Sequence, residues 1–347
     1  MEYFAIGLMS GTSLDGLDIC YAKFTKKDKW EFQIIHAETI PYNEEWEKLL
    51  RNAIYCSAED LFELNSRYGY LLGQLTRDFI HQYHIKKVDI VASHGHTVFH
   101  QPQKKFTVQI GDGRAIQQMI KLPIAYDFRS QDVIMGGNGA PLVPIGDELL
   151  FHKFDSCVNL GGFSNISFKK NNQRIAFDIS PANIILNDLA QKFGKNYDEN
   201  GEIAKNGSVS DELLQQLNCL DYYQQAPPKS LGLEWCINNI FPLIEGLDAQ
   251  TVISTFTEHI AEQISIVINE HNLQNVLFTG GGTFNRFLME TIQMKTNAAI
   301  IIPEESIINF KEALIFAFMG FLRLRNENNV LASSTGSSQD HCSGILI

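Results

Sequence analysis

The segment G-L-M-S-G-T-S-L-D-G-L-D at residues 7–18 combines small, hydroxyl and acidic residues that suit phosphate chemistry. The residues concerned are Gly11, Thr12, Ser13, Asp15 and Gly16. The glycines would let a phosphate approach the backbone, and the hydroxyls would donate to it. The aspartate could hold a magnesium ion through water. Because the segment joins two expected strands, it is neither a Walker loop nor a dinucleotide fingerprint, and an ordinary hairpin turn is the alternative.

Two further glycine runs could meet the same ligand. Gly161 and Gly162 join two expected strands in the second half of the chain. Their position there is equivalent to that of the first loop in the first half. Alone they need only reverse the chain, but two matching loops could clasp both ends of a triphosphate. Gly280, Gly281 and Gly282 connect an expected strand to an expected helix, so bare backbone could border a flat ligand or a phosphate. Tight helix–strand packing is the alternative, although one glycine would satisfy it.

Asp178 ends an expected strand in the segment F-D-I-S-P-A-N at residues 177–183. A partly buried carboxylate at the end of a strand can act as a general base, since burial tunes its pKa. Asp or Ser before a proline is also a common helix cap. Both interpretations stay open on the residue types alone.

Other charged and imidazole groups suggest substrate or metal binding. The segment S-H-G-H-T-V at residues 93–98 holds an H-x-H pair, His94 and His96, which can begin a metal site. The later histidines lie in expected helices or near the end, so a polar substrate loop is favoured over a metal-dependent hydrolase. Arg129 could bind a carboxylate or form a solvated salt bridge. Glu312 lies at an expected helix start, where an acid stabilises the helix end.

The elements that would position these groups recur in one order in both halves. In the first half, the periodicity predicts strands at 3–9, 17–24, 31–40 and 88–93 and a long helix at 57–82. In the second half, it predicts strands at 155–160, 163–169, 174–178 and 275–279 and helices from Pro181 as N1, at 251–269 and at 283–289. A duplicated architecture with a ligand cleft between its halves would explain this repeat, and so would a chance likeness of pattern.

Composition limits the class of protein. The chain has 347 residues, 44% of them hydrophobic, and 28 Lys and Arg against 40 Asp and Glu, which gives a formal charge of −12. This length favours about two domains. The acidic balance argues against a nucleic-acid or anionic-membrane partner. No apolar stretch approaches the roughly 18 residues of a membrane span, and six scattered cysteines fit a reduced, cytoplasmic protein.

In this order, the motifs resemble the anhydro-N-acetylmuramic acid kinase family, of the actin-like ATPase and hexokinase-type sugar kinase superfamily. The likeness runs from the loop at 7–18 to L-A-S-S-T-G at 331–336. Between them lie V-Q-I-G-D at 108–112, D-F-R-S-Q-D at 127–132, G-G-N-G-A-P-L-V-P at 136–144, N-L-G-G-F-S-N-I-S at 159–167, P-K-S-L-G-L-E-W at 228–235, G-G-G-T-F-N at 280–285 and E-A-L-I-F-A-F at 312–318. An ordered series is far more specific than any one of its motifs.

The resemblance implies a fold and an activity. The fold would be α/β, with two duplicated actin-like (ribonuclease H-like) domains at 1–126 and 127–347, ATP in the cleft between them, and the last helix packing back on the first domain. The activity would be an ATP- and magnesium-dependent sugar kinase of cell-wall recycling. It would open the 1,6-anhydro ring of 1,6-anhydro-N-acetylmuramic acid and phosphorylate the sugar to N-acetylmuramic acid 6-phosphate. A cytoplasmic homodimer is implied as well.

The same likeness assigns residue roles. Asp178 would deprotonate the attacking water. The phosphates would be held by Gly11 to Gly16, Gly161 and Gly162, with Asp15 near magnesium. The adenosine would lie against Gly280, Gly281, Gly282 and Asn285, and the sugar would meet His94, Arg129, Asn183 and Glu312.

The sequence departs from the family pattern in two places. The usual D-T-G-P-G-N is D-I-S-P-A-N at residues 178–183, and the usual S-H-G-Q is S-H-G-H at residues 93–96. Both changes lie close to the expected sugar, while the ATP loops are nearly intact. A kinase of another anhydrosugar, such as levoglucosan, therefore stays open as an alternative, as does a nucleotide-binding homologue that has lost turnover.

Overall fold

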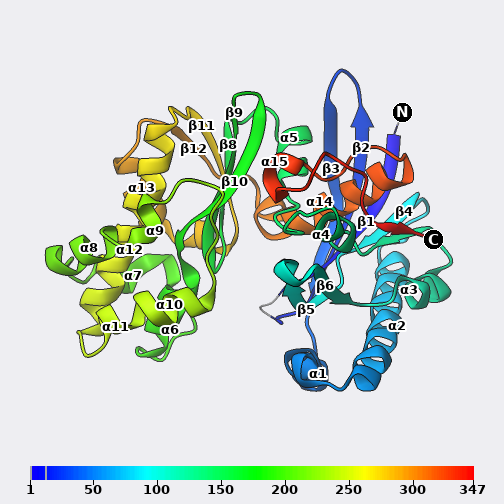
Figure 1. Ribbon diagram of the computed structural model, residues 1–347, viewed down its shortest axis with the longest axis horizontal. Helices are drawn as coiled ribbons and strands as arrows, with labels where there is room; N and C mark the ends of the chain where they lie inside the picture. The colour runs from blue at the N-terminus through cyan, green and yellow to red at the C-terminus, as the bar shows by residue number, and fades with distance from the viewer. Residues whose placement is uncertain (1, 12–13) are drawn as a thin grey trace. The chain divides into compact units, whose positions relative to one another are not determined.

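The computed structural model describes residues 2–11 and 14–347, and Figure 1 gives the labels of its helices and strands. Thr12 and Ser13, two of the candidate phosphate-binding residues, lie outside this described part. The chain forms two compact units, unit 1 at residues 1–151 and 310–347 and unit 2 at residues 152–309. Each has its own sheet and its own apolar core.

Unit 1 contains a six-stranded sheet of order β13-β7-β4-β1-β2-β3. Its strands are β1 Glu2–Ser10, β2 Leu17–Lys26, β3 Trp30–Ile40, β4 Ile90–Ser93, β7 Ile124–Tyr126 and β13 Ile345–Leu346. Strand β2 runs antiparallel to β1 and β3, whereas β1, β4 and β7 are parallel neighbours. A separate hairpin pairs β5 His96–Gln101 with β6 Phe106–Ile110.

Unit 1 also contains seven of the helices that the structure describes, among them α14, which extends into it from residue 305. They are α1 Glu44–Asn52, α2 Ala58–Gln82, α3 Gly113–Ile120, α4 Ser130–Ile134, α5 Pro144–Leu149, α14 Glu305–Leu324 and α15 Ala332–Thr335, with 3₁₀ turns at Ala53–Tyr55 and Pro102–Lys104. The predicted helix at 57–82 is confirmed as α2, whose N-cap Ser57 accepts a hydrogen bond from the Asp60 amide at 3.2 Å. Strand β1 lies directly on α14, because a Cβ on Gly7 would collide with the Ala313 carbonyl.

Unit 2 contains a five-stranded sheet of order β10-β9-β8-β11-β12. Its strands are β8 Ser156–Leu160, β9 Phe163–Lys170, β10 Gln173–Pro181, β11 Asn275–Thr279 and β12 Ala299–Ile301. Its helices are α6 Asn183–Gln191, α7 Glu202–Lys205, α8 Asp211–Asn218, α9 Asp221–Gln224, α10 Leu233–Asn239, α11 Phe241–Ile244, α12 Ala249–Glu270 and α13 Arg286–Met294, with 3₁₀ turns at Glu199–Gly201 and Gly281–Phe284. The long helix α12, seen with α13 in Figure 1, contributes many of the buried side chains of this unit's core.

The two sheets share one topology. In each, three consecutive antiparallel strands are followed by two parallel strands, β1-β2-β3 with β4 and β7 in unit 1 and β8-β9-β10 with β11 and β12 in unit 2. The strand order, rather than any likeness of residues, therefore confirms the duplicated architecture that the periodicity suggested. The glycine loops at 11–16 and 161–162 connect the equivalent first two strands of the two units.

Three local predictions differ from the structure. Pro181 is the last residue of β10, not N1 of a helix, because β10 pairs with β9 as far as Pro181 and Phe163. The run Gly280–Gly282 leads into a 3₁₀ turn, and α13 begins only at Arg286, capped by Asn285. Glu312 does not lie in the first turn of its helix, because α14 already begins at Glu305.

The sequence placed the domain boundary after residue 126, whereas the compact units separate at residue 151. Residues 127–151 stay with unit 1 because their buried acids bond to its C-terminal part. Asp132 accepts a hydrogen bond from Thr335 at 2.7 Å, and Asp147 lies 2.7 Å from the Lys311 ammonium group. The last long helix, α14, belongs to unit 1 from Phe310 onward.

Candidate functional site

The loop between β1 and β2 holds an exposed acid beside a partly buried one. Asp15 is exposed, while Gly16 is buried so closely that a Cβ would lie 2.5 Å from the Ile40 carbonyl oxygen. Packing against β3 thus explains the glycine at 16. Asp18, on β2, accepts a hydrogen bond from the Thr39 hydroxyl at 2.6 Å.

Negative charge is concentrated around Asp18. Burial raises the pKa of Asp18 to about 6, against the hydrogen bond from Thr39. The charges of Asp15 and Glu312 raise the pKa of Asp18 further. The charges of Asp15 in the first loop and Glu312 in α14 therefore both act on Asp18 in β2.

His94 is bonded at both ring nitrogens. Its Nδ1 lies 2.9 Å from the Gly95 carbonyl oxygen, so Nδ1 carries the proton, and its Nε2 accepts a hydrogen bond of 2.9 Å from Arg129 Nε. Burial, and secondly the charge of Arg129, keeps the pKa of His94 well below its ordinary value. A neutral His94 with no spare lone pair holds the guanidinium and is unsuited to bind a metal.

The second histidine of the H-x-H pair points into a different network. His96 Nδ1 lies 3.3 Å from Ser10 Oγ, which accepts a hydrogen bond from the Tyr42 hydroxyl at 2.9 Å. The Tyr42 and Tyr68 hydroxyls are 2.6 Å apart, and burial lowers the pKa of His96 to about 4. Within residues 2–11 and 14–347, no group of three or more His, Cys, Asp or Glu side chains could hold a metal ion.

Arg129 and Glu312 form the charged centre of unit 1. Arg129 Nη1 donates to the Gly139 carbonyl at 2.5 Å. Burial lowers the pKa of Arg129 to about 10, while the charges of Glu312 and Asp132 act in the opposite direction. Burial likewise raises the pKa of Glu312 against the opposing charges of Arg129 and Lys311. Glu312 is thus a partly buried acid in the middle of α14 rather than a helix cap.

In unit 2, backbone groups and a tyrosine hydroxyl hold Asp178. It lies at a bulge of β10, where the pairing register with β9 shifts. Its Oδ2 accepts a hydrogen bond from the Leu231 amide at 2.9 Å, and its carbonyl accepts one from the Tyr222 hydroxyl at 2.6 Å. Burial raises the pKa of Asp178, and the Leu231 amide opposes this. Bulges commonly redirect a side chain, and here one accompanies the carboxylate.

The glycines of unit 2 divide into two kinds. A Cβ on Gly280 would lie 2.6 Å from Asn159 Oδ1, and one on Gly282 would lie 2.7 Å from Leu160 Cβ, so packing requires both. Gly281 is exposed, with nothing within 4 Å of such a Cβ. A Cβ built on Gly161 would lie 3.3 Å from Asn159 Nδ2, and one on Gly162 would lie 3.8 Å from Ile184 Cβ. Packing therefore explains Gly280 and Gly282, crowds Gly161 against the Asn159 side chain, and leaves Gly162 and Gly281 unexplained.

The two candidate asparagines both have structural bonds. Asn183 Nδ2 donates to the Leu160 carbonyl at 3.1 Å, next to the Gly161–Gly162 turn. Asn285 Oδ1 accepts from the Leu288 amide at 3.0 Å and so caps α13. These bonds place both side chains at the ends of the glycine loops.

The residues that depart from the family pattern near Asp178 are buried within unit 2. Ile179 is 2% exposed and Ala182 is not exposed, and both belong to the apolar core. Ser180 is also unexposed, and its Oγ lies 2.9 Å from Ser164 Oγ. The substitutions therefore repack the interior of unit 2 behind Asp178.

The sequence did not indicate several residues around the predicted ones. Asp18 lies in the first motif and Leu231 in the motif at 228–235, but neither was singled out. Tyr222 carries no motif, because its bond to the Asp178 carbonyl depends on α9 folding against β10. A polar side chain on a buried strand, as in Asp18, is the only signal that could have been used.

The topology of each sheet defines a class, that of α/β proteins with duplicated actin-like (ribonuclease H-like) units. A model of the anhydro-N-acetylmuramic acid kinase family matches residues 3–347. The chain belongs to this family, and the resemblance predicted from its motifs is confirmed.

Two relatives of similar length carry the name of this family. The anhydro-N-acetylmuramic acid kinase of Francisella tularensis subsp. novicida (strain U112) is 31% identical over 367 residues, covering 97% of this chain and 96% of that protein. That of Clostridioides difficile (strain 630) is 30% identical over 365 residues, covering 96% and 95%. Among solved structures, component A of the (R)-2-hydroxyglutaryl-CoA dehydratase of Acidaminococcus fermentans is 10% identical, with a TM-score of 0.49 over 93% of this chain and 99% of that one.

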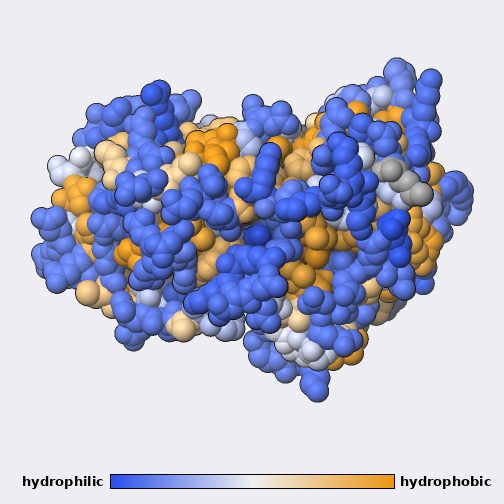
Figure 2. Space-filling model, turned by 90° about the horizontal axis from the view of Figure 1, so that it is seen from above, coloured by the Kyte–Doolittle hydropathy of each residue, from blue (hydrophilic) through white to orange (hydrophobic). Residues whose placement is uncertain are grey.

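No helix in the described residues is both long and apolar enough to span a membrane. On the face seen in Figure 2, hydrophilic residues predominate, with hydrophobic residues in smaller groups among them.

Proposed function

We propose that this chain is an ATP-dependent kinase that converts 1,6-anhydro-N-acetylmuramic acid, ATP and water into N-acetylmuramic acid 6-phosphate and ADP. Membership of the anhydro-N-acetylmuramic acid kinase family supports the substrate and the reaction. The observation that carries the proposal in this chain is the environment of Asp178. This residue lies at a bulge of β10, one of its carboxylate oxygens accepts a hydrogen bond from the Leu231 amide, and burial raises its pKa.

Asp178 is assigned as the general base. The Leu231 amide holds Oδ2, while Oδ1 accepts no hydrogen bond from the described part of the chain and can take a proton from water. A raised pKa makes a carboxylate a stronger base near neutral pH. As Oδ1 takes the proton, the water oxygen bonds to C1 of the sugar and the C1–O6 bond breaks. The electron pair passes to O6, which attacks the γ-phosphorus, and ADP departs. Asp178 then releases its proton to solvent.

Unit 1 supplies the sugar-binding charges in this proposal. Arg129, held by His94 and the Gly139 carbonyl, would bind the carboxylate of the muramic acid lactyl group in the bidentate manner that guanidinium allows. Glu312 would accept sugar hydroxyls. A sugar that lacks this carboxylate would lose the interaction with Arg129, so the assignment favours the muramic acid derivative over levoglucosan.

The glycine loops would hold ATP. Gly162 and Gly281 have no packing reason to lack a side chain, and Gly161 is crowded only by the Asn159 side chain, which suits backbone amides that approach phosphates or a nucleoside. The expected Gly11 loop would contribute likewise.

Magnesium fits the acidic group of unit 1. This ion is commonly bound through one or two carboxylates together with substrate phosphates, and Asp15 with Asp18 would provide them. Burial raises the pKa of Asp18, and the charges of Asp15 and Glu312 raise it further, so a divalent cation there would neutralise a local excess of negative charge. Bound there, magnesium would offset phosphate charge. Because ATP is a substrate, we also assign the reaction to the cytoplasm, and a homodimer remains a prediction.

The test is a turnover assay with purified protein, ATP and magnesium. We expect ADP and a sugar phosphate in equal amounts when 1,6-anhydro-N-acetylmuramic acid is present. ADP formation without sugar should be at least a hundredfold slower. Levoglucosan is the comparison substrate, since it has the anhydro bridge without the lactyl carboxylate. Faster turnover of levoglucosan, or ATP binding without turnover of either sugar, would contradict the proposal.

A further inference from the structure

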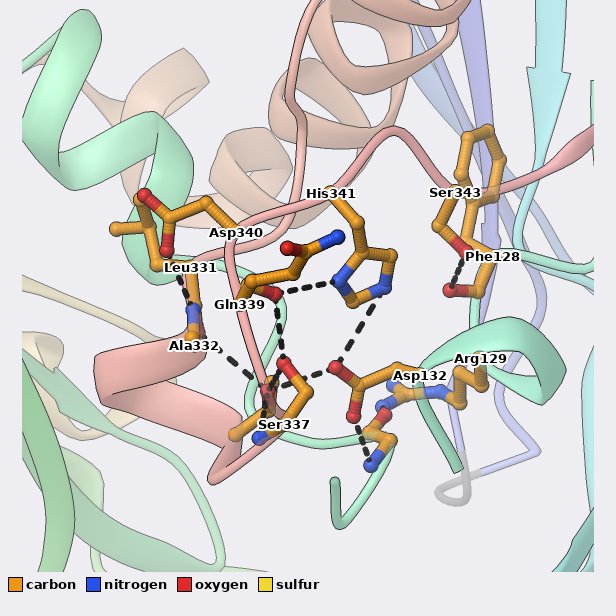
Figure 3. A network of polar contacts seen from close by, with 12 residues as sticks. Phe128, Arg129, Asp132, Leu331, Ala332, Ser337, Gln339, Asp340, His341 and Ser343 are labelled. Atoms are coloured by element: carbon orange, nitrogen blue, oxygen red, sulfur yellow. Dashed lines mark hydrogen bonds and ion pairs between the residues drawn. The ribbon is translucent and has the colours of Figure 1, made fainter. Parts of the chain in front are cut away.

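Asp132 is a wholly buried carboxylate that the roles assigned above leave unused. It lies on the short helix α4, three residues after Arg129. Its Oδ2 accepts a hydrogen bond of 2.7 Å from the Gly139 amide. Its Oδ1 accepts one of 2.7 Å from Thr335 Oγ1 and lies 3.6 Å from His341 Nε2, as Figure 3 shows for the last pair. Oδ2 is therefore bonded to the loop that follows α4, and Oδ1 to a segment far along the sequence.

The Gly139 end of this network leads directly to Arg129. The Gly139 amide donates to Asp132 Oδ2, and the Gly139 carbonyl accepts the hydrogen bond from Arg129 Nη1. The loop is wrapped tightly around the carboxylate, since a Cβ on Gly137 would collide with the side chain of Asp132. A shift of Asp132 would thus move the Gly139 carbonyl and the guanidinium that it holds.

The other end of the network is the C-terminal segment 331–343. Beyond its bond to Asp132, Thr335 accepts a backbone hydrogen bond of 2.8 Å from the Asn138 amide. Ser343 Oγ donates to the Phe128 carbonyl at 2.7 Å, on the other side of Arg129 in the sequence. The segment is therefore tied to the chain both before and after Arg129.

We propose that Asp132 and Thr335 are positioning residues, through which the C-terminal segment fixes Arg129 for the sugar. This rests on the proposed function, in which Arg129 binds the lactyl carboxylate. A buried carboxylate is costly unless hydrogen bonds compensate for lost water, and an apolar side chain would fill the space without that cost. Here the carboxylate joins the loop that holds Arg129 to a segment roughly two hundred residues away.

The experiment measures KM for the anhydrosugar, KM for ATP and kcat in Thr335→Val, which keeps the shape and removes the hydroxyl. We expect KM for the sugar to rise about tenfold while KM for ATP changes less than twofold. Thr335→Ser should restore the wild-type KM. Thr76→Val is the matched control, since Thr76 is equally buried in unit 1 and, among the described residues, its hydroxyl bonds only to the Leu72 carbonyl. It should leave both KM values unchanged.

A double variant decides whether the effect passes through Arg129. In an Arg129→Ala background, Thr335→Val should not raise KM for the sugar further. An additive rise, equal rises in both KM values, or no change in Thr335→Val would overturn the proposal. If Thr335→Val does not fold, Asp132→Asn is measured by the same criteria. Absence of turnover in the wild-type protein would instead refute the proposed function, so the two failures are distinguishable.

Discussion

The candidate residues of the two units are held in different ways. In unit 1, side chains hold side chains across long separations, as where His94 accepts from Arg129 and Thr335 donates to Asp132. In unit 2, main-chain groups and tight packing dominate. The Leu231 amide bonds to Asp178, and the glycines at 280 and 282 lie against β8.

This difference predicts where each unit is sensitive. A side-chain network carries charges whose protonation changes with pH, and it can be altered by a substitution far along the sequence. A backbone-held site depends on local geometry, so an added methyl group matters more than a lost charge. The same strand order thus supports two kinds of site, one governed by electrostatics and one by packing.

The largest expected effect is that of Asp178→Asn, which removes the carboxylate that the proposed mechanism uses as its base. Asparagine cannot take the proton from water, so kcat should fall by about 10²- to 10⁴-fold. KM for both substrates should change little, because asparagine can still accept from the Leu231 amide. Steady-state kinetics with the anhydrosugar measures this.

Asp188→Asn is the control for Asp178→Asn, since Asp188 is an exposed carboxylate on α6 of the same unit. It should leave kcat unchanged. If Asp178→Asn retained the wild-type kcat, the assigned base would be wrong, and the charges of unit 1 would be the place to look for it.

A smaller effect separates the two kinds of glycine in unit 2. Gly282→Ala introduces a Cβ at 2.7 Å from Leu160 Cβ and should lower the free energy of unfolding by about 1–3 kcal/mol. The added Cβ of Gly281→Ala would meet no atom within 4 Å, so the free energy of unfolding should not change. KM for ATP should rise, because the proposal places the nucleoside against this glycine. Chemical denaturation measures the free energy of unfolding, and steady-state kinetics measures KM for ATP. Equal losses of stability would contradict the division of these glycines.

Regular elements could be predicted from the sequence because their signals are local. The strand at 275–279 agrees residue for residue with β11, and the cap at Ser57 begins α2 as expected. The repeated order of elements suggested a duplication but left a chance likeness open, whereas the ordered motifs sufficed to predict the family. The predictions at Pro181 and Glu312 were wrong because each element is longer than its local sequence indicates. Strand pairing continues β10 to Pro181, and α14 begins seven residues before Glu312.

The side-chain networks could not be predicted, because they join residues far apart in sequence. Nothing local to Asp132 indicates that Thr335 will meet it, and nothing in β2 indicates that Glu312 will influence Asp18. The departures at Ile179, Ser180 and Ala182 illustrate the converse. Their position beside Asp178 suggested a changed sugar pocket, but their burial in the core of unit 2 depends on which way each side chain points.

The smallest expected effect concerns pH and tests the electrostatic character of unit 1. The pKa of Asp18 is about 6 in the folded protein, above the ordinary value of 3.8. Folding therefore disfavours the ionised form, and stability falls as pH rises from about 4 to about 6. Asp18→Asn removes this penalty while keeping an acceptor for Thr39. It should stabilise the protein by about 1–2 kcal/mol at pH 8, since partial exposure weakens the effect, and by nearly nothing below pH 4.

Urea denaturation of Asp18→Asn and the wild-type protein at pH 4 and pH 8 gives the two differences. Asp28→Asn is the control for the substitution itself, because Asp28 is exposed in the turn between β2 and β3. A gain at pH 8 that disappears at pH 4 would mean that unit 1 bears an electrostatic cost at neutral pH. Proteins bear such costs chiefly at functional sites, where a bound cation or substrate would relieve them. An equal gain at both pH values would instead assign the effect to packing, and unit 1 would then resemble unit 2.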